Sequence, residues 1–140
     1  KQEEQMSTGR DILIIEDDRD VVNSLRIILE SNDFTVRYAY NGKEGYAKIK
    51  EKAPDIIILD VMMSTDTEGF DLAYKLRDDP QYRNIPIILE TGFTQKMAED
   101  GPERFQHILG ESWPVSYFME KPVDPEKLLS TVQSIIKGSI

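Results

Sequence analysis

Five short apolar runs, separated by segments of helical periodicity, constrain the fold more than any other feature of the chain. "DILII" (residues 11–15), "DIIIL" (55–59) and "IPIIL" (85–89) are almost continuously apolar. That pattern is typical of strands buried on both faces of a parallel sheet. "FTVRYAY" (34–40) and "VSYFM" (115–119) are predicted as two further strands.

The segments between the runs carry apolar residues at helical spacing. Residues 21–30, 41–52 and 69–78 are predicted as helices. The last helix is expected to begin at Pro125, with Asp124 as its N-cap. Strand–helix units in this order predict an α/β domain, with helices on both faces of a parallel sheet.

Size and charge limit the kinds of function. The 140 residues fit one domain, predicted over residues 10–138, with residues 1–9 as a polar tail or linker. The net charge of −9 argues against direct nucleic-acid binding and against docking on an anionic membrane. No apolar run approaches the ~20 residues of a membrane span. The absence of cysteine suits a reducing cytosol, so we expect a cytoplasmic protein.

Polar residues follow the predicted strands at the edge where such sheets bind ligands. Glu16 and Asp17 follow the first strand and Asp60 the third, while the fourth runs into Thr91 and the fifth into Lys121. Neighbouring carboxylates repel one another unless they are protonated or bind a cation. Oxygen ligands favour a hard divalent ion, so the sequence predicts a Mg²⁺ site.

The cation would make Asp60 a plausible phosphoryl acceptor. A phosphoryl group brings further negative charge, which the cation and Lys121 would neutralise while Thr91 donates a hydrogen bond. Other acids have simpler interpretations: Asp18 and Asp20 are expected to cap the first helix. His107 and Trp113 are predicted to be surface or packing residues, because neither has a chemical partner at ligand spacing. Neither residue is assigned to the site.

Four motifs, in the same order along the chain, resemble those of the receiver domain of two-component response regulators. They are "ILIIEDD", "PDIIILDVMM", "IPIILETG" and "YFMEKPVDPEKLL", which together reach from Arg10 to Lys137. The resemblance implies a flavodoxin-like doubly wound (βα)5 fold with strand order 2-1-3-4-5. It also implies a sensor histidine kinase or phosphotransfer protein as partner, and a switch that catalyses its own modification rather than a turnover enzyme.

The resemblance also implies site roles. Asp60 matches the phosphorylated residue, Asp17 the direct Mg²⁺ ligand and Glu16 its neighbour, and the backbone carbonyl of Met62 matches the third protein ligand. The remaining matches concern switching: a hydroxyl at Thr91, an aromatic side chain at Phe118, a phosphate-pairing amine at Lys121, and a cis peptide bond between Lys121 and Pro122.

Three departures from the family pattern limit what the resemblance implies. Ser64 stands where a proline is usual, in a loop that is one residue longer. Glu90 replaces an apolar residue; strand alternation points it away from Thr91, so we expect it against a helix or at its edge rather than in the phosphate pocket. Residues 92–114 are longer than usual and Gly101-Pro102 interrupts them, so the fourth-helix region is predicted to be irregular and the oligomeric state stays open.

Three alternatives remain open. A receiver-like binding module could signal without phosphorylation. An aspartyl phosphatase generally needs a second acid two residues after its nucleophile, where this chain has Met62. A flavin-binding domain needs a phosphate-binding loop after the first strand, where "EDDRD" would repel phosphate.

Overall fold

A parallel sheet forms the centre of the molecule. The computed structural model describes residues 11–60, 68–91, 115–120 and 123–138. The sheet order is β2-β1-β3-β4-β5, and the predicted order of the first four strands is confirmed. Within the described part of the chain the strands are β1 (Asp11–Ile15), β2 (Thr35–Ala39), β3 (Ile56–Asp60), β4 (Ile87–Thr91) and β5 (Val115–Glu120).

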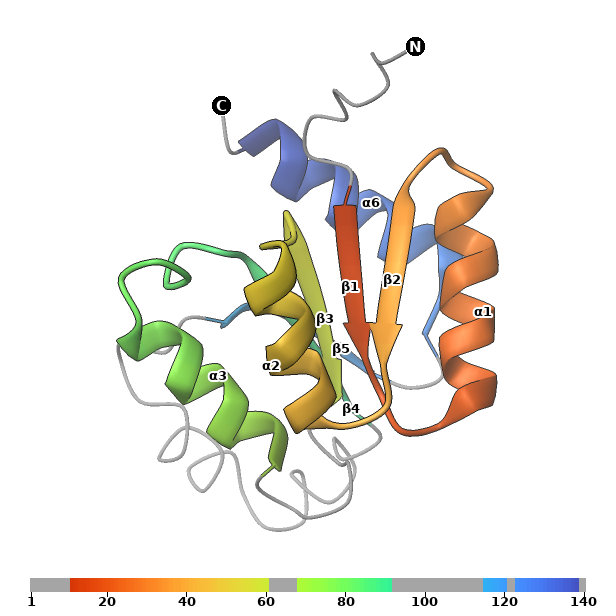
Figure 1. The fold of residues 1–140 in the computed structure, drawn as a ribbon. Helices are drawn as coiled ribbons and strands as arrows, with labels where there is room; N and C mark the ends of the chain where they lie inside the picture. The colour runs from red at the N-terminus through yellow and green to blue at the C-terminus, as the bar shows by residue number, and fades with distance from the viewer. Residues whose placement is uncertain (1–10, 61–67, 92–114, 121–122, 139–140) are drawn as a thin grey trace, which may run out of the picture.

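Helices cover both faces of this sheet, as predicted. Figure 1 shows α2 and α3 in front of it, with α1 and α6 on its other side. The predicted fourth-helix region, residues 92–114, lies outside the described residues, so its irregularity stays a prediction. The described helices are α1 (Arg19–Glu30), α2 (Gly42–Glu51), α3 (Glu68–Asp78) and α6 (Pro125–Gly138).

The core consists of two apolar layers, one on each face of the sheet. Successive strand residues alternate between the layers, because side chains of a strand point to opposite faces. In β1, Leu13 and Ile15 join the layer under α2 and α3, whereas Ile12 and Ile14 join the layer under α1 and α6. All four are 0% exposed. The unbroken apolar run of β1 therefore reflects burial on both faces.

Asp18 and Asp124 are confirmed as helix caps, whereas Asp20, also predicted to cap the first helix, lies within the first turn of α1. The side chain of Asp18 accepts hydrogen bonds from the backbone N–H groups of Asp20 and Val21, at 2.9 and 3.4 Å. Asp124 Oδ1 accepts one from the N–H of Glu126 at 3.0 Å, at the start of α6. These acceptors satisfy N–H groups that the first turn of a helix leaves without an intrahelical partner.

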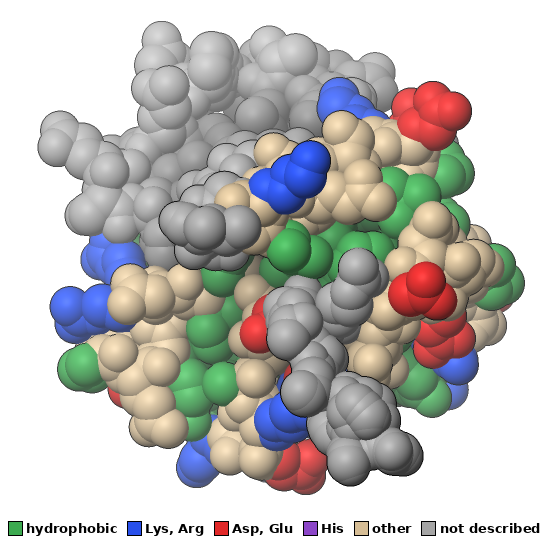
Figure 2. Space-filling model, turned by 90° about the horizontal axis from the view of Figure 1, so that it is seen from above, with side chains coloured by type: hydrophobic (Ala, Val, Ile, Leu, Met, Phe, Trp, Pro, Cys, Tyr) green, Lys and Arg blue, Asp and Glu red, His purple; other side chains and the backbone are tan. Residues whose placement is uncertain are grey.

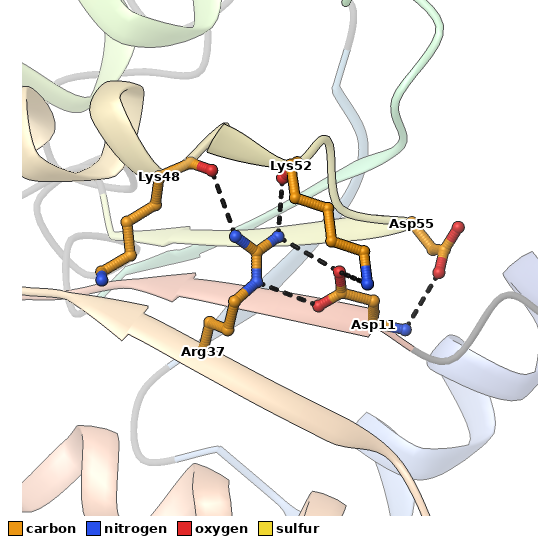
Figure 3. A network of polar contacts seen from close by, with 5 residues as sticks. All are labelled: Asp11, Arg37, Lys48, Lys52 and Asp55. Carbon is orange, nitrogen blue, oxygen red and sulfur yellow. Dashed lines mark hydrogen bonds and ion pairs between the residues drawn. The ribbon is translucent and has the colours of Figure 1, made fainter. Parts of the chain in front are cut away.

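Arg37 fastens β2 to β1 and to the end of α2. Its Nε and Nη2 donate to the two carboxylate oxygens of Asp11 at 3.2 and 3.1 Å (Figure 3). The same guanidinium donates to the carbonyl oxygens of Lys48 and Lys52, at 3.1 and 2.8 Å, and so satisfies the last turn of α2. The carboxylate of Asp55 completes the network by accepting from the N–H of Asp11 at 3.0 Å.

This network lies at the edge of the sheet where the strands begin. Asp11 opens β1, and its backbone carbonyl accepts a 2.8 Å hydrogen bond from the N–H of Asp55, just before β3. Figure 2 looks onto the molecule from this side and shows acidic and basic side chains close together among apolar ones. At this edge the carboxylate of Asp11 is paired with Arg37 at 3.1 Å and with Lys52 at 3.7 Å.

Gly45 allows α2 to lie close to β1. A Cβ atom at this position would stand 2.6 Å from Cδ1 of Ile15 and 2.9 Å from its Cγ1. Both distances are shorter than ordinary carbon contacts, and Ile15 is 0% exposed, so its side chain has little room to yield. Glycine at position 45 is thus required by packing. The contact also fixes Ile15, the residue that directly precedes Glu16.

Replacing Arg37 should test the network at the start of the sheet. We expect Arg37→Ala to lower the free energy of unfolding by about 2–4 kcal/mol, because it leaves the buried Asp11 carboxylate poorly compensated. Arg37→Lys should recover only part of the loss, since an ammonium cannot reproduce the planar fork. Urea unfolding measures both changes.

The control for this prediction is Arg26→Ala, which removes an exposed i,i+4 ion pair with Glu30. Its cost should stay below about 1 kcal/mol. Equal losses for Arg26→Ala and Arg37→Ala would contradict the account of the network.

Gly45→Ala should also destabilise the protein, although alanine is the better helix former by about 1 kcal/mol. We expect a net loss of about 1–3 kcal/mol from overpacking against Ile15. Adding Ile15→Val removes Cδ1, so the double variant should lose less stability than the two single variants summed. Simple additivity in thermal unfolding would show that the predicted clash is absent.

Candidate functional site

The acidic residues of the site stand where two adjacent strands end. β1 and β3 pair in parallel with Ile15 opposite Leu59, so Glu16 and Asp60 are the next residue on each strand. The N–H of Glu16 donates to the carbonyl of Ala39 at 3.0 Å, which extends the β1–β2 ladder by one bond. Glu16 is 0% exposed and Asp60 is 1% exposed. Both carboxyl groups are therefore held inside the fold.

Glu16, Asp17 and Asp60 form one group of carboxylates. An oxygen atom from each lies within 4.8 Å of the corresponding atoms of the other two. Glu16 and Asp60 are buried, whereas Asp17 is exposed, so the group opens to solvent on the side of Asp17. Carboxylate oxygens are the ligands that Mg²⁺ prefers, and this donor set fits that ion.

A local hydrogen bond fixes the orientation of Glu16. Its Oε2 accepts from the backbone N–H of Asp18 at 3.0 Å. Asp18 in turn is the N-cap of α1, so the start of this helix determines where the chain turns after β1. The same turn holds Asp17 beside Glu16. The spacing "EDD" thus combines two site residues with one capping residue.

The other predicted site residues are only partly placed. Thr91 is the last residue of β4, one position beyond the residue in register with Asp60, and β5 ends at Glu120, one residue before Lys121. These backbone positions put the ends of β4 and β5 at the same edge of the sheet as Asp60. The side chains of Thr91 and Phe118 are outside the described part, as are Met62, Lys121 and Pro122, so their roles stay predictions.

Glu90 lies closer to the site than its sequence position indicated. It is 0% exposed and pairs in register with Asp60 on one side and Met119 on the other. The sequence predicts that Glu90 lies against a helix or at its edge rather than in the phosphate pocket. Burial on the face covered by α1 and α6 agrees with a place against a helix. The register, however, makes Glu90 the direct neighbour of Asp60 on the adjacent strand. Only the pairing of β3 with β4 could have revealed this.

Comparison with known proteins identifies the family. The family model of the response regulator receiver domain matches residues 12–133. The chain belongs to this family. The match includes both strands that end in the acidic group, so the carboxylates of Glu16, Asp17 and Asp60 occupy the carboxyl edge of a receiver domain.

Individual receiver proteins show the same likeness. Response regulator PleD of Caulobacter vibrioides is 36% identical over 126 residues, which are 90% of this chain and 26% of PleD. Protein PilH of Pseudomonas aeruginosa is 28% identical, over 91% of this chain and 98% of PilH. The crystal structure of the signal receiver domain of a histidine kinase from Syntrophus aciditrophicus has a TM-score of 0.77 at 29% identity, covering 91% of this chain and 90% of that one.

Membership in the family supports two general statements. Receiver domains typically bind Mg²⁺ at an acidic pocket, and they interact with histidine kinases or phosphotransfer partners. The chain spans about a quarter of the length of PleD, the first of these relatives. Among the described residues, no helix combines the length and apolar character that crossing a bilayer requires.

Mg²⁺ should stabilise the folded protein through the acidic group. At a hundredfold excess over its dissociation constant, a ligand specific for the folded state adds about 2.7 kcal/mol. We expect Asp17→Asn to abolish most of the Mg²⁺-dependent rise in melting temperature, because it removes the exposed ligand without creating a cavity. Thermal unfolding with Mg²⁺ and with EDTA measures the effect.

Asp33→Asn serves as the matched control for this measurement. It makes the same change of charge in the turn after α1, at a φ of 73° that asparagine tolerates. The control should keep the full Mg²⁺-dependent shift. Loss of the shift in both variants would assign the cation effect to overall charge instead of to the acidic group.

Proposed function

We propose that this receiver domain accepts a phosphoryl group on Asp60, in a Mg²⁺-dependent reaction, from a phosphohistidine of a sensor kinase or phosphotransfer protein. The observation that carries the proposal is the group of Glu16, Asp17 and Asp60 at the carboxyl edge of a receiver sheet. Phosphorylation would change the surface through which the domain interacts with partners. The domain would therefore act as a switch and not as a turnover enzyme.

The proposed reaction transfers a phosphoryl group from a histidine side chain of the donor to the side chain of Asp60. A carboxylate oxygen of Asp60 attacks the phosphorus atom, the P–N bond to the donor imidazole breaks, and the nitrogen keeps the electron pair. The new bond is the P–O bond of an aspartyl phosphate. Asp60 is 1% exposed at the end of a fully buried strand, so packing restricts the position of its carboxylate, and such positioning favours reaction with a bound donor.

Glu16 and Asp17 would hold the cation next to the acceptor. Asp17 is exposed and can bind the ion directly, while the buried Glu16, fixed by the N–H of Asp18, contributes charge and orientation. A bound Mg²⁺ supplies positive charge that offsets the repulsion between the acceptor carboxylate and the incoming phosphoryl group. The carbonyl of Met62 is proposed as a further ligand on the basis of family resemblance.

The switching residues belong to β4 and β5. Both strands run parallel to β3 and end at the same edge, which supports Thr91 as a hydrogen-bond donor to the phosphoryl group and Lys121 as its ionic partner. Movement of these two residues toward the phosphate would repack the region around Phe118 and the fourth helix of a complete (βα)5 fold. Such a local change of charge, acting on a two-state element, is how phosphorylation commonly switches a protein.

Acetyl phosphate provides the direct test of phosphoryl acceptance. Incubation with acetyl phosphate and Mg²⁺ should add one phosphoryl group, and peptide mass spectrometry should locate it on Asp60. Asp60→Asn should remove the signal. Asp55→Asn makes the same change of charge and should keep the signal, since Asp55 directly precedes β3, at the end of the strand opposite to Asp60.

Two other outcomes have distinct meanings. If the protein binds Mg²⁺ but gains no phosphoryl group, the proposal is wrong and the chain is a receiver-like module that signals without phosphorylation. Phosphorylation of Asp60→Asn at the same extent as wild type would place the acceptor elsewhere and contradict the assignment.

A further inference from the structure

In the described part of the chain, Glu90 is a buried acid that belongs neither to the Arg37 network nor to the proposed reaction. Among the described residues, Asp11, Glu16, Asp60 and Glu90 are the buried acids. Asp11 belongs to the Arg37 network, and Glu16 and Asp60 belong to the acidic group. Burying a carboxyl group in an apolar layer is costly unless its surroundings compensate for it. Its register with Asp60 makes the effect of Glu90 on the acidic site the question to test.

Glu90 and Asp60 project from the same face of the sheet. Ile58 and Ile88 pair in register and both pack in the apolar layer covered by α1 and α6. Two residues further along each strand come Asp60 and Glu90, which pair in register and, by alternation, face the same way. Adjacent strands lie about 4.8 Å apart, so the two side chains begin one strand spacing from each other.

On this face of the sheet, an apolar row of side chains is followed by an acidic row at the carboxyl ends of the strands. Ile14, Ile58 and Ile88 form an apolar row under α1 and α6. The next row toward the carboxyl edge contains buried acids on three adjacent strands, namely Glu16 on the chain after β1, Asp60 on β3 and Glu90 on β4. Glu90 stands outside the group whose oxygens lie within 4.8 Å of one another, so it is a neighbour of the site and not one of its candidate ligands.

We propose that the negative charge of Glu90 strengthens binding of the divalent cation beside Asp60 and opposes addition of the phosphoryl group to Asp60. The second half of the proposal rests on the proposed function. A charge one strand away from Asp60, in the low-dielectric interior, acts on a cation through space without coordinating it. The same field repels an incoming phosphoryl group.

These two effects have opposite signs, and a packing role would not produce that pattern. If Glu90 only filled space, its replacement would disturb Asp60, and cation binding and phosphorylation would weaken together. If Glu90 acts through charge, its neutral analogue should bind the cation less tightly and accept the phosphoryl group faster once the site is saturated with cation.

The first experiment measures Mg²⁺ binding to Glu90→Gln by isothermal titration calorimetry, with no phosphoryl donor present. Glutamine keeps the shape of glutamate and removes the charge. We expect the dissociation constant to rise about tenfold, which corresponds to about 1.4 kcal/mol at 25 °C. The control is Glu51→Gln, an exposed change of equal charge at the end of α2, where binding should stay at the wild-type value. An unchanged affinity in Glu90→Gln would overturn the proposal.

The second experiment measures the rate of phosphorylation by acetyl phosphate at saturating Mg²⁺. Glu90→Gln should react several times faster than wild type, and a slower or unchanged rate would overturn the proposal. Wild-type protein that binds no Mg²⁺ or takes up no phosphoryl group would instead contradict the proposed function, so the two failures are distinguishable.

A third variant separates charge from folding. Glu90→Met replaces the carboxyl group with an apolar side chain of similar length, next to Met119 in the adjacent strand. In EDTA it should melt at a higher temperature than wild type, because a buried charge is removed, and Mg²⁺ should stabilise it less. A lower melting temperature in EDTA together with an undiminished Mg²⁺ shift would show that Glu90 acts by packing alone.

Discussion

Mutual repulsion among carboxylates at one edge of the sheet is the constraint on which the structure depends. Glu16, Asp17 and Asp60 bring oxygens within 4.8 Å of one another, and two of the three side chains are fully buried. Like charges at this range destabilise a fold unless a proton or a cation compensates for them. The arrangement is therefore suited to binding a cation, and under the proposed function a bound cation would lower the repulsion between Asp60 and an incoming phosphoryl group.

The rest of the fold supplies the rigidity that keeps these acids together. Apart from Asp11 and Asp60, the residues of β1 and β3 are apolar and buried, so neither strand can shift its register without exposing core residues. At the opposite edge Arg37 ties β1, β2 and α2 together. Charges are neutralised where the strands begin and concentrated where they end. The Arg37 network, which stabilises the fold, and the acidic group thus lie at opposite edges of the sheet.

Local patterns were sufficient to predict much of this architecture. The apolar runs located the strands, because burial on both faces leaves a strong signal, and the capping roles of Asp18 and Asp124 followed from residue type and position. Contacts between distant segments were not predictable in the same way. Arg37 looked like an ordinary polar strand residue, and Glu90 became a neighbour of Asp60 only through the register of β3 with β4. Strand register depends on the packing of whole layers, which no short segment encodes.

Crystals grown with Mn²⁺ as an anomalous substitute for Mg²⁺ provide the most direct test of the acidic group. We predict one strong anomalous peak between Asp17 and Asp60, at about 2.0–2.3 Å from a carboxylate oxygen of each, as expected for an octahedral ion with oxygen ligands. A peak elsewhere on the molecule, or an ordered acidic group with no peak at saturating Mn²⁺, would contradict it.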